Sequence, residues 1–297
     1  MISGLRKPNP VHRKPNSLPA RKRMTLALGM LCKEALVIAA DTQITWSDGR
    51  TEHGIKVHLV ICNSGSYALT CACVDSDAAN TLISAIQRDL RLIDPKSLIG
   101  MESVITDSMK AWYESSRSGE DRPYIQLVVG ASINRNPSIE DDELGLYFCE
   151  PPNTVSRKTM EDGKGYIGVG EGNAVIKSTF CTLFSDLPSP RVCLNRLSYL
   201  MYKAKKDCAS SVGGDTDAVV LWRGQIQPQW VNRLDMAQAE SLGRLIDNAL
   251  SRVASAIISE TYLADREVLN LAGDIQTKGL AYKNSLQFHS RTGEEIL

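Results

Sequence analysis

The first strong hydrophobic pattern in the chain lies between residues 26 and 41. Apolar side chains fill positions 26–32 and 35–40, and the polar pair Lys33-Glu34 separates the two runs. Short apolar runs joined by a polar pair are typical of buried strands connected by a tight turn. The pattern predicts a hairpin that has Thr25 directly before its first strand and Asp41 at the end of its second.

Further along the chain, apolar runs and helical periodicity alternate. Apolar runs predict strands at residues 57–62, 66–73, 124–131, 144–149, 154–158, 218–222 and 226–231. Apolar residues three and four apart predict five helices. One begins near Ser76 or Asp77, and a second runs from about 101 to near 118. Two more cover about 173–185 and 191–207, and Asp235 caps the last. Paired hairpins with helices in successive pairs predict an α+β fold, a four-layer αββα sandwich with two antiparallel sheets between helical layers.

Two helices carry a defined apolar stripe. The predicted buried face of the first comprises Ala79, Leu82, Ile83, Ile86 and Leu90, and that of the long C-terminal helix comprises Leu242, Leu245, Ile246, Ala249, Val253 and Ile257. The tail from about residue 265 is mixed and predicts no element. The expected division is a basic leader at 1–24, a central domain at 25–234, and a C-terminal helix and tail at 235–297.

Charge is unevenly distributed along the chain. Residues 1–23 contain seven basic residues and no acid, so 27 of the 34 basic residues and all 34 acidic ones follow. An acidic body does not favour a nucleic-acid partner. No apolar run approaches the length of a membrane span, so no membrane association is expected.

The eight cysteines lie within apolar or helical patterns and have no C-x-x-C spacing. Scattered thiols of this kind indicate a reducing compartment, so we expect a cytoplasmic protein without a metal site or other cofactor. One interpretation of the glycine-rich stretch 165–172 is a dinucleotide-binding loop, but no strand-helix-strand unit precedes it. Close backbone packing is the favoured interpretation.

The proline-rich basic leader has two interpretations. It is a disordered segment, or the start codon is assigned too far upstream, because Met24 is itself a candidate initiator. Removal of Met24 before the small residue Thr25 would make this threonine the N-terminus.

The residues from Thr25 to Asp41, together with Gly54-Ile55-Lys56, resemble the start of mature catalytic proteasome subunits and of their bacterial proteasome-like relatives. The spacing of 16 residues between Thr25 and Asp41 is the family's spacing between nucleophile and aspartate. The segment Lys206 to Gly214 resembles the family's Asp-x-x-Ser element, with Asp207 and Ser210 at the matching positions. The chain departs from the family at Ala72, where the family has an oxyanion glycine, and at Val169, where it has a serine.

This resemblance implies a threonine-type endopeptidase of proteasome architecture. Thr25 would be the nucleophile and its own α-amine the base, with Lys56 and Asp41 as a supporting ion pair. Asp207 and Ser210 would hold the amine. The backbone near Ala72 would bind the oxyanion, and the segment after Thr45 would border the substrate strand.

The resemblance also implies partners: identical or related subunits in a ring, a peptide or unfolded-protein substrate, and an ATP-dependent unfoldase as a further candidate. Two alternatives stay open. One is a catalytically inactive ring subunit, which Val169 and the missing glycine favour, and the other is a hydrolase of small amides with the same N-terminal nucleophile. His53 and His58, which flank Lys56, are interpreted as incidental.

Overall fold

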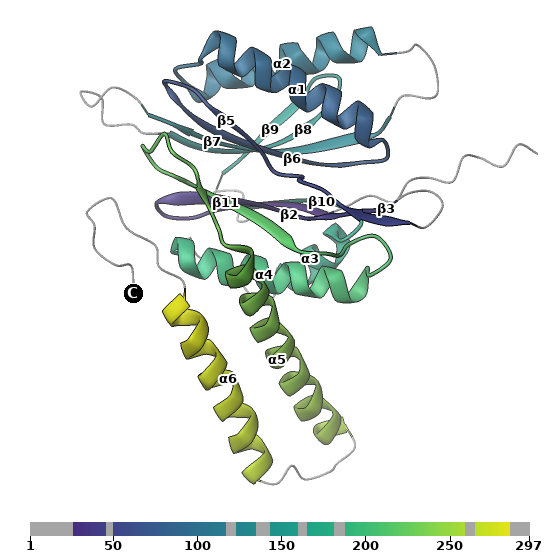
Figure 1. The fold of residues 1–297 in the computed structure, drawn as a ribbon, viewed down its shortest axis with the longest axis vertical. Coiled ribbons are helices and arrows are strands. Elements are labelled where there is room, and N and C mark those ends of the chain that lie inside the picture. Colours follow the sequence, from purple (N-terminus) through teal and green to yellow (C-terminus); the bar gives the residue numbers. More distant parts are fainter. Residues whose placement is uncertain are drawn as a thin grey trace, which may run out of the picture.

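The computed structural model describes residues 26–45, 50–116, 123–134, 143–159, 165–180, 188–258 and 265–285. These residues form three antiparallel sheets and six helices, which confirms the predicted combination of helices with antiparallel strands (Figure 1). The nucleophile candidate Thr25 lies just outside the described residues, directly before the first strand.

The first five-stranded sheet contains both strands of the predicted N-terminal hairpin. Its order is β10 (Tyr166–Gly170), β1 (Leu26–Leu31), β2 (Ala35–Asp41), β11 (Thr216–Trp222) and β12 (Gln229–Trp230). Helices α3 (Asn173–Phe180) and α4 (Pro190–Asp207) lie on one face of this sheet (Figure 1). Alternate side chains of β1 and β2 pack with α4 in one hydrophobic cluster, as strand alternation requires.

The second five-stranded sheet is a meander in chain order. It comprises β5 (His58–Ile61), β6 (Gly65–Cys73), β7 (Ile125–Ile133), β8 (Glu143–Glu150) and β9 (Thr154–Lys158). Helices α1 (Ser76–Ile93) and α2 (Leu98–Ser115) cover its outer face (Figure 1). The five residues predicted for the inner face of α1 are all buried there.

A third hydrophobic cluster fills the space between the two large sheets. It is built from small and aliphatic side chains, such as Ala27 and Ile38 from the first sheet and Ala68 and Val128 from the second. The sheets approach closely at Gly29, where an added Cβ would lie 2.5 Å from Leu146 Cδ1. A larger residue at this position would force the sheets apart.

A short hairpin that the sequence pattern did not predict leads from the first sheet to the second. It is formed by β3 (Gln43–Thr45) and β4 (Thr51–His53), and only three residue pairs join its strands. Runs this short lack the alternation from which a strand is predicted. The hairpin matters because Lys56 follows it directly.

The helix termini differ from the sequence prediction. Asp75, rather than Ser76 or Asp77, caps α1, because its side chain accepts from the backbone N–H groups of residues 77 and 78. At the start of α5 (Arg233–Ile258), the side chain of Asn232 accepts from Leu234 N, and Asp235 lies in the first turn.

The predicted buried stripe of α5 is buried only at Ala249, whereas Leu242, Leu245 and Ile246 are partly buried. Val253 is 39% exposed, because the distal half of the helix extends beyond the sheet (Figure 1), and the side chain of Ile257 lies outside the described residues. A further helix, α6 (Asp265–Ser285), lies where the sequence predicted no element and packs beside α5 (Figure 1). Within the described residues, no helix is long and apolar enough to cross a membrane.

Candidate active site

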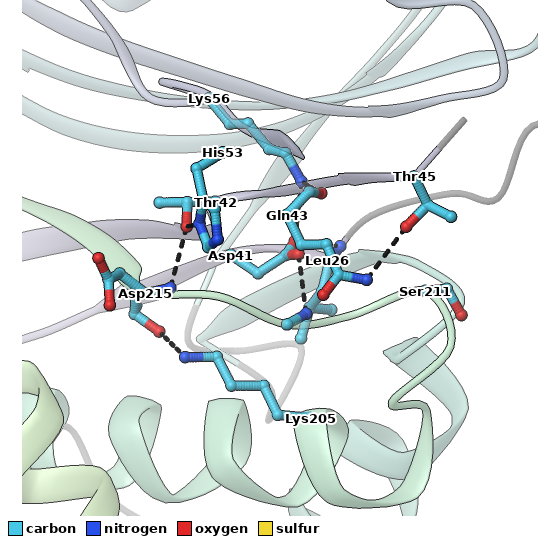
Figure 2. Close-up of polar contacts among 12 residues, drawn as sticks. Leu26, Asp41, Thr42, Gln43, Thr45, His53, Lys56, Lys205, Ser211 and Asp215 are labelled. Atoms are coloured by element: carbon cyan, nitrogen blue, oxygen red, sulfur yellow. Dashed lines mark hydrogen bonds and ion pairs between the residues drawn. The ribbon is translucent and has the colours of Figure 1, made fainter. Parts of the chain in front are cut away.

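Asp41 is the centre of a buried polar cluster at the end of β2. Its side chain is fully buried, and its carboxylate accepts from Leu26 N at 2.9 Å, from Gly213 N at 3.1 Å and from Lys56 Nζ at 3.3 Å (Figure 2). A buried carboxylate is costly unless such donors surround it. The cluster therefore connects β1, the loop before β11 and the segment before β5 through one side chain.

Lys56 approaches Asp41 from the segment that joins the two large sheets. Its side chain is 11% exposed, and its ammonium also donates to the carbonyl oxygen of Gln43. Burial lowers the pKa of Lys56 below its ordinary value, and attraction to Asp41 offsets part of that effect. Asp41 and Lys56 thus form a buried ion pair where the two large sheets are joined.

The loop between α4 and β11 forms the other wall of the cluster. Residues 42 and 43 pair through their backbones with residues 213–215, and Asp215 N donates to Thr42 Oγ1 at 2.9 Å. Gly214 has φ of 70°, and a Cβ there would lie 2.6 Å from Thr42 Oγ1. Glycine is needed here for both reasons, because the loop must turn tightly to bring Gly213 N to Asp41.

His53, interpreted as incidental from the sequence, has a defined contact. Its Nδ1 lies 3.1 Å from Thr42 Oγ1, the hydroxyl that accepts from Asp215 N (Figure 2). Because Gly54 N also donates to the Thr42 carbonyl, this contact holds the hairpin that precedes Lys56 against the loop. We read it as a structural support for the ion pair.

The two residues expected near the substrate, Thr45 and Ala72, lie on strands β3 and β6. Thr45 is 9% exposed and accepts from Gln43 Nε2 at 3.0 Å. Ala72 is fully buried at the end of β6, in the cluster between the sheets. The thiols of its neighbours Cys71 and Cys73 are near enough to Lys56 to raise its pKa, so the end of β6 lies beside the ion pair.

The two residues expected to hold the α-amine have different surroundings. Asp207 is the last residue of α4, its side chain is 40% exposed, and it lies 3.9 Å from Lys203 in the preceding turn. Ser210 is exposed on the loop that follows. The adjacent Ser211 is 2% exposed, and its hydroxyl donates to the Glu171 carboxylate and lies 3.5 Å from the Cys208 carbonyl oxygen.

The sequence analysis missed Glu171 and Ser211. They are 40 residues apart in the chain, and neither occupies a motif position. The only signal was that both lie within stretches already singled out, the glycine-rich link and the Asp-x-x-Ser segment. Among the described residues, no group of three or more His, Cys, Asp or Glu side chains could hold a metal ion.

Taken together, the described residues can perform two tasks at the start of β1. They can fix the main chain at Leu26 through Asp41, and they can place a positive charge beside it through Lys56. A positive charge next to an amine or hydroxyl favours the deprotonated form of that group. The arrangement therefore suits a nucleophile attached to Leu26.

Comparison with solved structures gives matches over most of the chain. Anbu, described as an ancestral beta-subunit, from Yersinia bercovieri has a TM-score of 0.61 and 13% sequence identity, and the match covers 81% of this chain and 99% of that chain. A Gly-1 mutant of Anbu from Hyphomicrobium sp. strain MC1 gives a TM-score of 0.60 and 16% identity over 81% and 99% of the two chains. The fold is that of Anbu. A helical assembly of the Anbu complex from Pseudomonas aeruginosa matches with a TM-score of 0.60 and 15% identity over 78% and 96% of the chains.

These matches correct the predicted family. The sequence analysis assigned the chain to the catalytic proteasome subunits or bacterial proteasome-like peptidases, and that assignment is wrong, since the matching structures are of Anbu. No family model and no curated protein matches the chain, and identities of 13–16% show the fold alone.

Proposed function

We propose that this chain hydrolyses peptide bonds with Thr25 as an N-terminal nucleophile, within an Anbu-like assembly of identical or related subunits. One observation carries the proposal. The buried ion pair of Asp41 and Lys56 also holds the nitrogen of Leu26, the atom to which the Thr25 carbonyl carbon is bonded. The pair thus lies one residue from the proposed nucleophile.

The proposed chemistry begins with a free α-amine at Thr25. The unperturbed pKa of such an amine is about 8, so it can accept the hydroxyl proton near neutral pH. The Thr25 oxygen then attacks the substrate carbonyl carbon, and the ammonium returns the proton to the leaving amine. Water hydrolyses the resulting ester and restores the threonine.

Lys56 would favour the alkoxide and the neutral amine through its charge, and Asp41 would keep Lys56 ionised and in place. Asp207 and Ser210 would hold the amine by hydrogen bonds. No metal ion or other cofactor is needed for this sequence of steps.

The substrate would add as a strand beside the end of β6. Strand β6 pairs with β7 along its whole length but with β5 only as far as Leu69. The last residues of β6 therefore have one edge without a β5 partner. Backbone N–H groups near Ala72 would donate to the oxyanion, at about 3 kcal/mol per donor in comparable acyl-transfer enzymes. Thr45 would border the substrate on the opposite side.

The assembly and layer architecture are part of the same proposal. We infer a four-layer αββα subunit at 25–234 that joins copies of itself in a closed or helical array, with an ATP-dependent unfoldase as a candidate partner. Residues 235–297 would contribute to assembly, because the distal half of α5 extends beyond the sheet and α6 packs beside it (Figure 1). A cytoplasmic location accords with the seven cysteines of the described residues, all of which are free thiols.

A catalytically inactive assembly subunit is the second candidate. It is favoured by Val169, which is 1% exposed between the sheets and offers no hydroxyl, and by the β-carbon of Ala72. A hydrolase of small amides is the third. Neither alternative requires a peptide to bind beside β6.

N-terminal sequencing and intact-mass measurement of the native protein test the proposal first. Thr25 is expected at the N-terminus, and a Thr25 still joined to Met24 would exclude catalysis by this route. Cleavage of fluorogenic peptides and of small amides by the same preparation then separates the candidates. Peptide cleavage that disappears in Thr25→Ala supports the endopeptidase, and inactivity toward both substrates supports the assembly subunit.

A further inference from the structure

Helix α5 carries three charged residues at a spacing of seven. Arg233, Glu240 and Asp247 follow one another at intervals of about two helical turns, so they share one face of the helix. Arg233 lies in the first turn, where the helix dipole disfavours a cation. The stability of α5 alone therefore does not explain an arginine at this position, and its partners lie in and beside β11.

Arg233 binds the two carboxylates at the start of β11. Its Nε donates to Asp217 Oδ1 at 2.7 Å, and its Nη1 lies 3.7 Å from Asp215 Oδ2. Asp217 is 5% exposed, and its second carboxylate oxygen has no hydrogen-bond partner among the residues that the structure describes. The ion pair with Arg233 therefore offsets the cost of burying Asp217.

Glu240 binds the residue between those two aspartates. Thr216 Oγ1 donates to Glu240 Oε1 and accepts from Lys205 Nζ at 2.8 Å (Figure 2). Lys205, on α4, also donates to both Glu240 oxygens, at 2.8 and 2.9 Å. Thr216 is 2% exposed and pairs opposite Asp41 in the sheet, so the two side chains lie on the same face. The three consecutive residues 215–217 are thus each bound by α5.

These three residues directly follow the glycine that binds Asp41. Gly213 N donates to Asp41 Oδ2 at 3.1 Å, and only Gly214 separates Gly213 from Asp215. On the opposite side, Thr42 N donates to the Asp215 carbonyl oxygen at 2.9 Å. The two glycines have no side chains with which to pack, so their position depends on the bonds that their neighbours make. The loop is therefore held between Thr42 and helix α5.

We propose that Arg233 and Glu240 are positioning residues of the candidate active site, which hold the start of β11 so that Gly213 N stays on Asp41. The effect on hydrolysis rests on the proposed function. Loss of the Gly213 donor would leave a buried carboxylate oxygen without one of its partners, and Asp41 would then be held less firmly against Leu26 N and Lys56. The first turns of α5 thus support the site, in addition to the proposed part of this helix in assembly.

Hydrogen exchange of the full chain, measured by mass spectrometry, tests this inference without requiring activity. The readout is the exchange rate of a peptide that contains residues 213–216, divided by that of a peptide from the centre of β2, because the second reports opening of the whole sheet. The variants are Glu240→Gln and Arg233→Gln. The Arg233 side chain is 53% exposed, so its substitution leaves a folded protein even if Glu240→Gln prevents folding.

Asp247→Asn is the matched control. Asp247 lies on the same face of α5, and its carboxylate accepts from Lys203 at 3.3 Å and also from Tyr202 and Lys206, all three on α4. The substitution therefore weakens the attachment of α5 to α4 but removes no bond to β11. Arg233→Lys keeps the positive charge without the planar guanidinium and is the conservative variant.

We expect the ratio to rise roughly tenfold or more in Glu240→Gln and in Arg233→Gln, since each loses a hydrogen bond to a charged group. Arg233→Lys should give a smaller rise. Asp247→Asn should change both exchange rates alike and leave the ratio as in the wild type. Peptide hydrolysis by the chain that begins at Thr25 is measured in parallel, and kcat should fall in the two glutamine variants while KM is unchanged.

The outcomes separate this inference from the proposed function. An unchanged ratio in either glutamine variant removes that residue from the assignment, whether or not the chain is active. An equal rise in Asp247→Asn would overturn the inference, because the effect would then belong to the attachment of α5 as a whole. A rise with an unchanged kcat would overturn the role in the active site. If the ratio rises but the wild type cleaves no peptide, the proposed function fails while the positioning of Gly213 stands.

Discussion

The main-chain nitrogen of Leu26 lies 2.9 Å from the Asp41 carboxylate, which is fully buried. The same carboxylate binds Lys56 and the nitrogen of Gly213, so the start of β1 is fixed against two other parts of the chain at once. Any change to Asp41 must therefore affect both the stability of the fold and the position of the residue attached to Leu26.

Asp41→Asn should destabilise the protein strongly. The substitution keeps the size of the side chain but leaves the Lys56 ammonium buried without its counter-charge, a loss of about 3–5 kcal/mol for buried pairs. Urea denaturation of both proteins measures the free energy of unfolding. Glu34→Gln makes the same chemical change at an exposed position near β2 and should stay within about 0.5 kcal/mol of the wild type. A loss below about 1 kcal/mol in Asp41→Asn would contradict the buried ion pair.

The lowered pKa of Lys56 predicts a pH dependence of stability. Burial disfavours the ammonium in the folded protein, whereas the unfolded chain titrates near 10.5. As pH rises toward 10.5, the folded state loses this proton first, so the unfolded state binds more protons and the free energy of unfolding increases.

The increase should be absent in Lys56→Met, which has nothing to titrate at this position. Denaturation of both proteins from neutral pH to about 10.5 gives the difference in their free energies of unfolding, in which other groups cancel. The expected result is a difference that moves in favour of the wild type across this range. A constant difference would show that Lys56 titrates normally in the folded protein.

The sequence predicted the parts of the fold where periodicity and burial coincide. The residues of β1 and β2 and the buried face of α1, from Ala79 to Leu90, follow directly from apolar spacing. Helix α6 was missed because its described side chains are mostly exposed, so no core face marks its sequence. Val253 was placed in a core for the opposite reason, since a stripe of apolar residues does not say where the sheet beneath it ends.

Some contacts of the candidate site could be predicted from the sequence and others could not. Asp41 and Lys56 could be predicted as partners because a family spacing links them, although that resemblance also suggested the wrong family. The contact between Glu171 and Ser211 could not, because it joins two loops 40 residues apart and depends on how α4 ends. The Gly213–Asp41 bond spans 172 residues and has no local signal at all.

Asp94→Asn should lower stability in a way that disappears in acid. Burial alone would raise the pKa of Asp94, but hydrogen bonds from Lys96 and Ser64 outweigh it and lower the pKa from 3.8 to about 2. The stability from the ionised form is therefore fully present above pH 3.8 and is lost as pH falls through about 2. Asparagine accepts the positive φ of 46° at this position, so the substitution tests the charge.

The expected loss is about 1 kcal/mol at neutral pH, the net value of one hydrogen bond to a partly exposed group. Thermal or urea unfolding from pH 6 to about pH 2 measures it, with Asp77→Asn on the exposed start of α1 as the control. The curves of wild type and Asp94→Asn should converge at the acid end. Curves that stay parallel would mean that the Asp94 carboxylate contributes no pH-dependent stability.

Gly214→Ala should destabilise the site loop, and Gly273→Ala should stabilise α6. Both substitutions restrict the unfolded chain equally, so that contribution cancels between them. At position 214, φ is 70° and the new Cβ would lie 2.6 Å from Thr42 Oγ1 and 2.7 Å from His53 Cε1. Strain and overpacking together should cost about 2 kcal/mol or more. At position 273 nothing lies within 4 Å of the added Cβ, and alanine should gain up to about 1 kcal/mol from helix propensity.

Urea denaturation of the two variants and the wild type measures this contrast. The Gly214→Ala loop can relieve its clash only by moving away from Thr42, which would withdraw the Gly213 nitrogen from Asp41. Peptide hydrolysis by the chain that begins at Thr25 should then fall in Gly214→Ala and be unchanged in Gly273→Ala, since α6 lies far from β2 and β3 in the fold (Figure 1). Equal stabilities for the two variants would show that the loop does not need glycine, and the proposed coupling of this loop to Asp41 would then be wrong.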